Sequence, residues 1–180
     1  MIPFPDKKYS VIYADPPWDY GDKPSKIGEG GDFIIPYPMM STPDICDLPV
    51  QNIASDDCLL FMWTTGLFLE DAFKVGKSWG FKYSTIGFNW DKQLPILGCY
   101  TMIQTELCLI FRRGKIPQPR GKRNIKQFLS CKKGAHSVKP LEIRHRITEM
   151  FPTQAKIELF ARPNWTGYDR GWDFWGNEVS

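Results

Sequence analysis

Short apolar runs alternate with amphipathic stretches along this chain of 180 residues. Runs rich in Val, Ile, Leu and Phe predict strands buried on both faces of a sheet, and five are expected, at 9–15, 58–65, 81–90, 106–111 and 155–161. Apolar residues at helical spacing predict helices at 41–48, 67–79 and 140–151, with Gly80 and Pro152 as stop signals. This order favours an α/β fold in which helices cover both faces of a mainly parallel sheet.

Two stretches lack this periodicity. Residues 20–38 contain six Gly or Pro before Tyr37, and residues 112–136 are basic and interrupted by Gly and Pro. Both are predicted to be flexible loops, and the first has a length that is often functional. The tail over 162–180 is expected to be irregular and aromatic. Since no repeat or linker divides the sequence, a single domain over residues 1–180 is predicted.

Composition narrows the class of protein. No apolar run approaches 18 residues and the N-terminus lacks the pattern of a signal peptide, so neither a membrane span nor secretion is expected. The five cysteines include no C-x-x-C pair, and the chain has two histidines. These features favour free thiols in a cytoplasmic protein, and no metal site is expected.

The charge is unevenly distributed, although the net charge is only +3. No acidic residue occurs between Glu106 and Glu142, whereas ten lysines and arginines lie in that interval. Such a cluster is typical of a surface that binds a polyanion, and the alternative is a solvated loop. Three of its members are candidate phosphate contacts beside the active site: Arg120, Lys122 and Arg123.

The residues after the first predicted strand, Asp15-Pro16-Pro17-Trp18, combine groups suited to one reaction. Adenine N6 is a poor nucleophile because its lone pair is delocalised into the ring, and acceptors aimed at its hydrogens favour the reactive form. Asp15 supplies a carboxylate acceptor and Pro16 a carbonyl in a restricted chain, while Trp18 offers a face for stacking. The alternative interpretation is a Pro-Pro turn followed by a buried Trp.

Further motifs extend the pattern over nearly the whole chain. They are YADPPW at 13–18, PYPMMS at 36–41, LFMWTT at 60–65, NWDK at 89–92, TELCLI at 105–110, HSVKPLE at 136–142, IELFAR at 157–162 and GWDFWGNE at 171–178. In order and spacing the chain resembles the adenine-N6 methyltransferases that include the eukaryotic messenger-RNA methyltransferase subunit and bacterial and phage members. The resemblance implies a Rossmann-like methyltransferase fold, circularly ordered, with the catalytic motif first and the cofactor motif last.

The resemblance also implies a role for individual residues. Asp15 and Pro16 would hold the N6 amine, with Pro17 stiffening the turn and Trp18 packing near the base. Residues on the substrate side would be Tyr37, Trp63, Trp90, Lys92 and Glu106. Lys139 would pair with the methionine carboxylate of S-adenosylmethionine, and the adenosine would be lined by Phe160, Arg162, Asn177 and Glu178. Lys139 at a predicted helix start suits a carboxylate, although it could be a surface residue.

The activity implied is metal-free transfer of a methyl group from S-adenosylmethionine to adenine N6, leaving S-adenosylhomocysteine. DNA is favoured over RNA because the chain lacks the accessory segments of eukaryotic members, and a monomer or homodimer of bacterial or phage origin is expected. An RNA methyltransferase and a catalytically silent nucleic-acid-binding subunit are the alternatives. One departure is Met102-Ile103, where the family usually has Arg-Asn, so a substrate contact of that Arg is in doubt.

Overall fold

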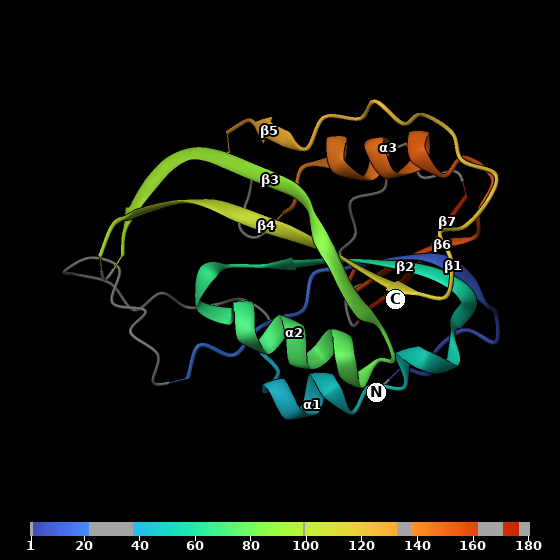
Figure 1. Cartoon of the computed structure of the whole chain (residues 1–180). Coiled ribbons are helices and arrows are strands. Elements are labelled where there is room, and N and C mark those ends of the chain that lie inside the picture. Colours follow the sequence, from blue (N-terminus) through green and yellow to red (C-terminus); the bar gives the residue numbers. More distant parts are fainter. Residues whose placement is uncertain (1, 22–37, 99, 133–137, 162–170, 177–180) are drawn as a thin grey trace.

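The computed structural model describes residues 2–21, 38–98, 100–132, 138–161 and 171–176, and its strands form one sheet (Figure 1). The strand order is β5-β3-β4-β2-β1-β6-β7. The strands are β1 (Tyr9–Ala14), β2 (Ala54–Thr64), β3 (Lys82–Leu97), β4 (Met102–Arg113), β5 (Phe128–Ser130), β6 (Lys156–Leu159) and β7 (Trp172–Trp175). The helices are α1 (Thr42–Cys46), α2 (Leu69–Ser78) and α3 (Leu141–Met150), with short 3-10 turns η1 (Val50–Asn52) and η2 (Gly66–Phe68).

Most neighbouring strands run parallel. The parallel pairs are β1–β2, β1–β6, β6–β7 and β3–β5, whereas β4 runs antiparallel to both β2 and β3. Continuous apolar runs at the centre, such as β1, pack on both faces, which is the property that predicted this arrangement. The expected α/β, Rossmann-like fold with a mainly parallel sheet is confirmed.

Two apolar layers sandwich the sheet, because alternate residues of each strand face opposite sides. Ile12 of β1 and Leu60 of β2 lie in the layer under α1 and α2. Val11 and Phe61 lie in the other layer, together with Ile143 of α3. Figure 1 shows α1 and α2 below the sheet and α3 above it, so helices cover both faces as expected. None of the described helices is long and apolar enough to cross a membrane.

The outer parts of the sheet, on either side of β2, β1 and β6, differ from the sequence-based expectation. Strands β3 and β4 extend beyond the predicted 81–90 and 106–111 and form a long antiparallel hairpin. The predicted loop 112–136 contains the end of β4 and all of β5, and the predicted irregular tail contains β7. Strands of three or four residues show too little alternation to be found in sequence, and the hydrogen bonds of a neighbouring strand define them. Of the other predicted loop, 20–38, most lies outside the described residues.

The centre of the sheet brings three strand ends to one edge. Ala14, the last residue of β1, pairs with Met62 of β2 and with Leu159 of β6. All three strands run in the same direction, so the residues that follow them, among them Asp15 and Phe160, lie at the carboxyl edge of the sheet. This is the edge at which parallel α/β folds bind ligands.

Candidate active site

The segment after β1 is fixed by backbone hydrogen bonds. The Trp18 N–H donates to the Pro16 carbonyl (2.9 Å), which closes a tight turn immediately after Asp15. The Met40 N–H donates to the Pro17 carbonyl (2.8 Å), and Trp18 and Met40 form an isolated β-bridge. The turn is therefore held against the chain that enters α1, and Asp15 projects from a rigid frame at the carboxyl edge.

Trp18 is buried rather than open to a base. Its side chain is stacked on Phe68 with ring centroids 5.5 Å apart, and its indole N–H donates to the Trp63 carbonyl at 3.2 Å. Only 7% of Trp18 is exposed. The structure thus agrees with the alternative interpretation of this residue, a buried Trp after a Pro-Pro turn. Trp18 anchors the motif to the core, and the expectation of a free stacking face is corrected.

Four charged side chains form a continuous chain across the carboxyl edge. Lys92 donates to one oxygen of Glu106 at 3.1 Å, and Lys139 lies 3.3 Å from the other. Lys139 also donates to Asp15 Oδ2 at 2.8 Å. The signs alternate from Lys92 through Glu106 and Lys139 to Asp15, so each charge is neutralised by a neighbour. The side chains come from β3, β4, the segment before α3 and the segment after β1, and the predicted site residues among them are brought together.

Burial and ion pairing shift the pKa values of these groups in opposite directions. Burial of Lys139 lowers the pKa of its ammonium, but the carboxylates of Asp15 and Glu106 more than offset this and the pKa lies above its usual value. Burial raises the pKa of Glu106, and the two lysines outweigh it, so the pKa of that carboxyl lies below its usual range. Both Lys139 and Glu106 are consequently charged at neutral pH.

Two tryptophans form the floor beneath this chain of charges. The Trp63 indole N–H donates to the Tyr13 hydroxyl at 2.6 Å, and its ring meets that of Trp90 edge to face. The Lys139 ammonium lies 5.7 Å from the centre of the Trp63 ring, within the range of a cation–π contact. Trp63 is 0% and Trp90 2% exposed. Of these two predicted substrate-side residues, Trp63 therefore lies against Lys139, and Trp90 packs on Trp63.

Comparisons with known proteins give the same assignment. A family model described as MT-A70 matches residues 9–178. The chain belongs to the MT-A70 family. It is 47% identical to the Type II methyltransferase M.MunI of a Mycoplasma species over 189 aligned positions, which cover 97% of this chain and 79% of that protein.

More distant relatives in this family are eukaryotic. The chain is 28% identical to the human N(6)-adenosine-methyltransferase catalytic subunit METTL3 and 29% identical to a Drosophila melanogaster MT-A70-like N(6)-adenosine-methyltransferase. In each case 96% of this chain is covered, but it spans only 28% and 27% of those longer proteins. The family match and its range confirm the resemblance seen in the motifs.

Backbone strain marks one predicted site residue and the neighbour of another. Among the described residues other than glycine, only Gln93 (φ 54°) and Phe160 (φ 60°) have positive φ values. Such conformations are unfavourable for residues with a Cβ atom and tend to occur at functional sites. Phe160 directly follows β6 and meets Trp175 edge to face, and Gln93 directly follows Lys92. Phe160 lies at a predicted cofactor position and Gln93 beside a predicted substrate position.

Two polar atoms near the carboxyl edge were missed by sequence reasoning. Thr65 Oγ1, just after β2, and Asn89 Oδ1, beside Trp90, are buried without a hydrogen-bond partner among the described residues. Unpaired buried polar atoms are rare and require an explanation, and a bound polar ligand is one. Both belong to the quoted motifs LFMWTT and NWDK, which was the only available signal.

The basic stretch lies elsewhere. The backbone N–H groups of Gly121 and Lys122 donate to the carbonyls of Met150 and Glu149, and the Arg120 guanidinium lies 5.4 Å from the Phe151 ring centre. These are contacts with the C-terminal end of α3, whereas Lys139 precedes its N-terminal end. The expected placement of the candidate phosphate contacts Arg120, Lys122 and Arg123 beside the Asp15 pocket is therefore corrected. Helix α3 separates them from it.

The remaining predicted residues lie outside the described part of the chain. These are Tyr37 on the substrate side and Arg162, Asn177 and Glu178 on the cofactor side. Among the described residues, no group of three or more His, Cys, Asp or Glu side chains is arranged to hold a metal ion.

Proposed function

We propose that the protein transfers a methyl group from S-adenosylmethionine to the exocyclic N6 amine of adenine in DNA. The observation that carries this proposal is the Asp15 carboxylate, fixed at the carboxyl edge after β1 and paired with Lys139 at 2.8 Å. Membership of the MT-A70 family supports methyl transfer. DNA is preferred as the substrate because identity to the Type II methyltransferase, 47%, far exceeds the 28% identity to the human N(6)-adenosine-methyltransferase.

The residues at this edge fit the cofactor. A lysine ammonium has three N–H donors, and Asp15 and Glu106 take two of those of Lys139. Among the described residues no further carboxylate pairs with Lys139, so its third N–H can bind the methionine carboxylate while the other two stay with Asp15 and Glu106. The Thr65 and Asn89 oxygens, which have no partner within the described part of the chain, lie at the same edge, as does the strained Phe160 backbone. When bound, the cofactor supplies an activated methyl group on a cationic sulfur.

The chain's own residues then prepare the amine. The Asp15 carboxylate accepts a hydrogen bond from N6–H, which turns the lone pair out of the ring plane and stabilises positive charge developing on nitrogen. The Pro16 carbonyl already accepts the Trp18 N–H, which fixes its direction, and its second lone pair can take the other N6 hydrogen. Lys139 pairs with Asp15 and orients its carboxylate through the 2.8 Å contact.

Transfer of tritium from labelled cofactor to matched DNA and RNA oligonucleotides tests this function. N6-methyladenine formed in DNA, and absent with Asp15→Asn, is the expected result. Labelling of RNA alone would assign the activity to RNA, and labelling of neither, with intact cofactor binding, would indicate a catalytically silent subunit.

A second measurement tests the Lys139 assignment. Lys139→Ala should weaken S-adenosylhomocysteine binding by about 2–3 kcal/mol, the scale of a lost charged hydrogen bond. Binding of 5′-methylthioadenosine, which lacks the carboxylate, should change little. Equal losses for both compounds would show that Lys139 acts on Asp15 and Glu106 alone.

A further inference from the structure

The most exposed large apolar side chains gather at one place. Five such residues of the described chain are more than half exposed: Leu94 (56%), Leu97 (63%), Tyr100 (100%), Met102 (56%) and Phe128 (56%). Four of the five lie at the outer end of the β3–β4 hairpin. We call this outer end, residues 93–98 and 100–104, the arm. Apolar residues left in water together in this way typically mark a binding surface.

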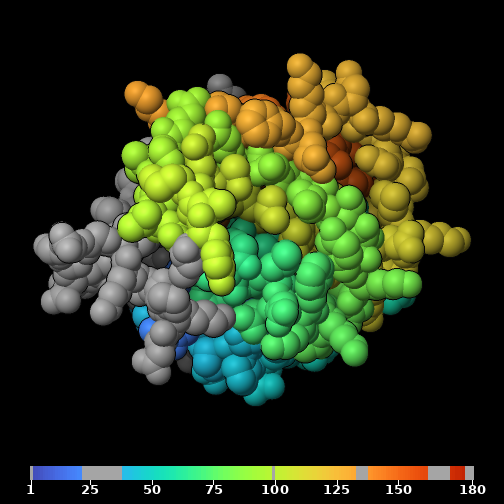
Figure 2. Space-filling view, turned by 60° about the vertical axis from the view of Figure 1, so that its left-hand side comes forward, coloured from blue at the N-terminus to red at the C-terminus, as the bar shows by residue number. Residues whose placement is uncertain are grey.

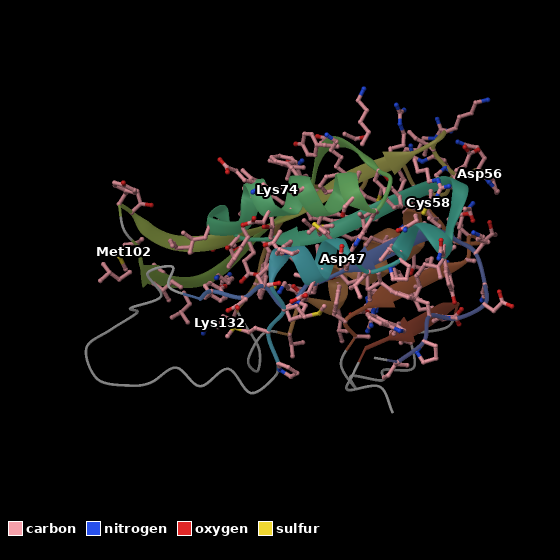
Figure 3. All side chains as sticks on the ribbon, turned by 90° about the horizontal axis from the view of Figure 1, so that it is seen from below. Asp47, Asp56, Cys58, Lys74, Met102 and Lys132 are labelled. Atoms are coloured by element: carbon pink, nitrogen blue, oxygen red, sulfur yellow. The ribbon has the colours of Figure 1, made fainter. Side chains whose placement is uncertain are left out.

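The arm projects from the catalytic edge. Thr64, the last residue of β2, pairs with Leu107, so the part of β4 before Leu107 continues past the body of the sheet. Figure 1 shows the hairpin reaching beyond the end of β2, and Figure 3 places Met102 at the opposite end of the molecule from Asp56 of β2. The base of the arm carries Lys92 and Glu106, which belong to the chain of charges at Asp15. The yellow-green side chains of the hairpin form part of the surface in Figure 2.

The absence of charged residues from the arm suits one kind of partner. No charged residue occurs from Gln93 to Gln104. Asp91, the acid at the base, has both carboxylate oxygens engaged, one by Gln104 Nε2 at 2.6 Å and the other by the Ser130 hydroxyl at 2.7 Å. Lys132, exposed, lies in the segment that hydrogen-bonds to β3 at Asp91. The arm therefore presents apolar groups free of negative charge, with a cation near its base, which suits stacked bases flanked by phosphates.

We propose that the arm is a wedge that enters the DNA duplex and occupies the space left by the target adenine. This inference rests on the proposed function, because an adenine in duplex must leave the stack before its N6 reaches Asp15. The four residues from Glu106 to Met102 span about 13 Å in extended conformation. That length exceeds the depth of the major groove, about 8.5 Å, so side chains at the tip can reach the base pairs while the flipped base is held at the edge.

The geometry of the tip agrees with insertion. Leu97 and Met102 pair across the two strands and present their side chains together. A Cβ atom on Gly98 would come within 2.6 Å of the Thr101 carbonyl, so this position beside Leu97 requires glycine. Leucine and methionine are among the side chains that other proteins insert between base steps.

The test compares substrates that do and do not require flipping. Leu97→Ser/Met102→Ser should lower kcat/KM about 10–100-fold on duplex DNA, and by no more than about twofold on a single strand or on a duplex with an abasic position opposite the target. In duplex DNA, 2-aminopurine placed at the target position becomes more fluorescent when it is flipped out. The double variant should no longer produce this rise. Ile116→Ser is the matched control. Ile116 is also an exposed apolar residue, but it lies after β4 at the amino edge of the sheet, away from the arm.

Equal loss on all three substrates, or no loss, would overturn the wedge. A change from dimer to monomer in light scattering, together with loss on all substrates, would assign the arm to a second copy of the chain. Failure of the proposed function would look different, because the wild-type protein itself would then methylate neither single-stranded nor duplex DNA.

Discussion

The two edges of the parallel sheet use the same kinds of ion pair in different surroundings. At the carboxyl edge, the side chains of Lys92, Glu106, Lys139 and Asp15 are 8–23% exposed and linked in one chain. At the amino edge, Lys7 and Asp173 pair at 2.7 Å with side chains 53% and 41% exposed. Lys122 pairs with Glu149 at the far end of α3 and is similarly exposed.

The difference in burial distinguishes ion pairs that serve catalysis from ion pairs that serve only stability. An exposed pair loses little water and contributes about 0–1 kcal/mol. A buried pair must offset a large loss of hydration, so apolar residues of the same size are often as stable. Four linked charges at one edge are therefore poorly explained as a device for stability. They are explained if the Asp15 carboxylate must be held in one orientation beside a cation when substrate binds.

Asp15→Asn should produce the largest effect. The amide keeps the size of the side chain but loses the charge that supports positive charge on N6, and removal of one such group commonly lowers kcat by 10²-fold to 10³-fold or more. Glu106 continues to pair with Lys139, so the fold should be retained. Methyl transfer and thermal unfolding are measured together. Turnover near the wild-type level would refute the catalytic assignment.

Removing a lysine from each edge compares the two environments directly. Lys139→Met leaves two carboxylates without their shared cation in a largely buried site, and should destabilise the fold by about 3 kcal/mol. Lys122→Met removes half of an exposed pair and should change stability by no more than about 0.5 kcal/mol. Urea unfolding of both variants measures the contrast, and similar values for the two would show that burial at the carboxyl edge has little energetic consequence.

Acid titration should detect the buried chain of charges through Glu106. The pKa of this carboxyl is lowered in the folded protein, so it contributes stability above its unfolded value of about 4.3, and this contribution is lost as pH falls through the folded value. The pKa of Lys139 is raised, so its contribution is present below its unfolded value, about 10.4, and is lost only as pH rises through the folded one. Unfolding free energies of wild type and Glu106→Gln should converge in acid. A constant difference down to pH 3 would contradict this.

The catalytic edge was predictable from sequence to a useful degree. Asp15 was found from its position directly after an apolar strand, whereas Lys139 was assigned by the family resemblance, with which its position before a predicted helix agrees. The contact between them was not predicted, because residues 124 apart in sequence meet only once β1 and α3 are packed. Trp18 was misjudged for a similar reason. A sequence shows an aromatic residue but does not show whether Phe68 covers it.

The arm and the basic stretch were the parts of the molecule that the sequence predicted least well. The β3–β4 arm has uncharged residues throughout and lacks a buried face, so no alternation marks its strands. Clustering of positive charge indicated a polyanion site around Arg120 and Lys122, but charge density carries no information on the distance from Asp15. The structure shows that this segment is bonded to Glu149 and Met150, at the opposite end of α3 from Lys139.

The smallest effect is expected from the basic stretch itself. In Arg120→Gln/Lys122→Gln/Arg123→Gln the changed residues lie at the end of α3 remote from Asp15, where Arg120 packs on Phe151 and Lys122 pairs with Glu149. Each phosphate contact adds about one unit to the slope of log affinity against log salt. A DNA site confined to the carboxyl edge predicts a slope within about 0.5 of wild type. Filter binding over a salt series measures it, and a slope flattened by about three units would extend the DNA path along α3 to the amino edge.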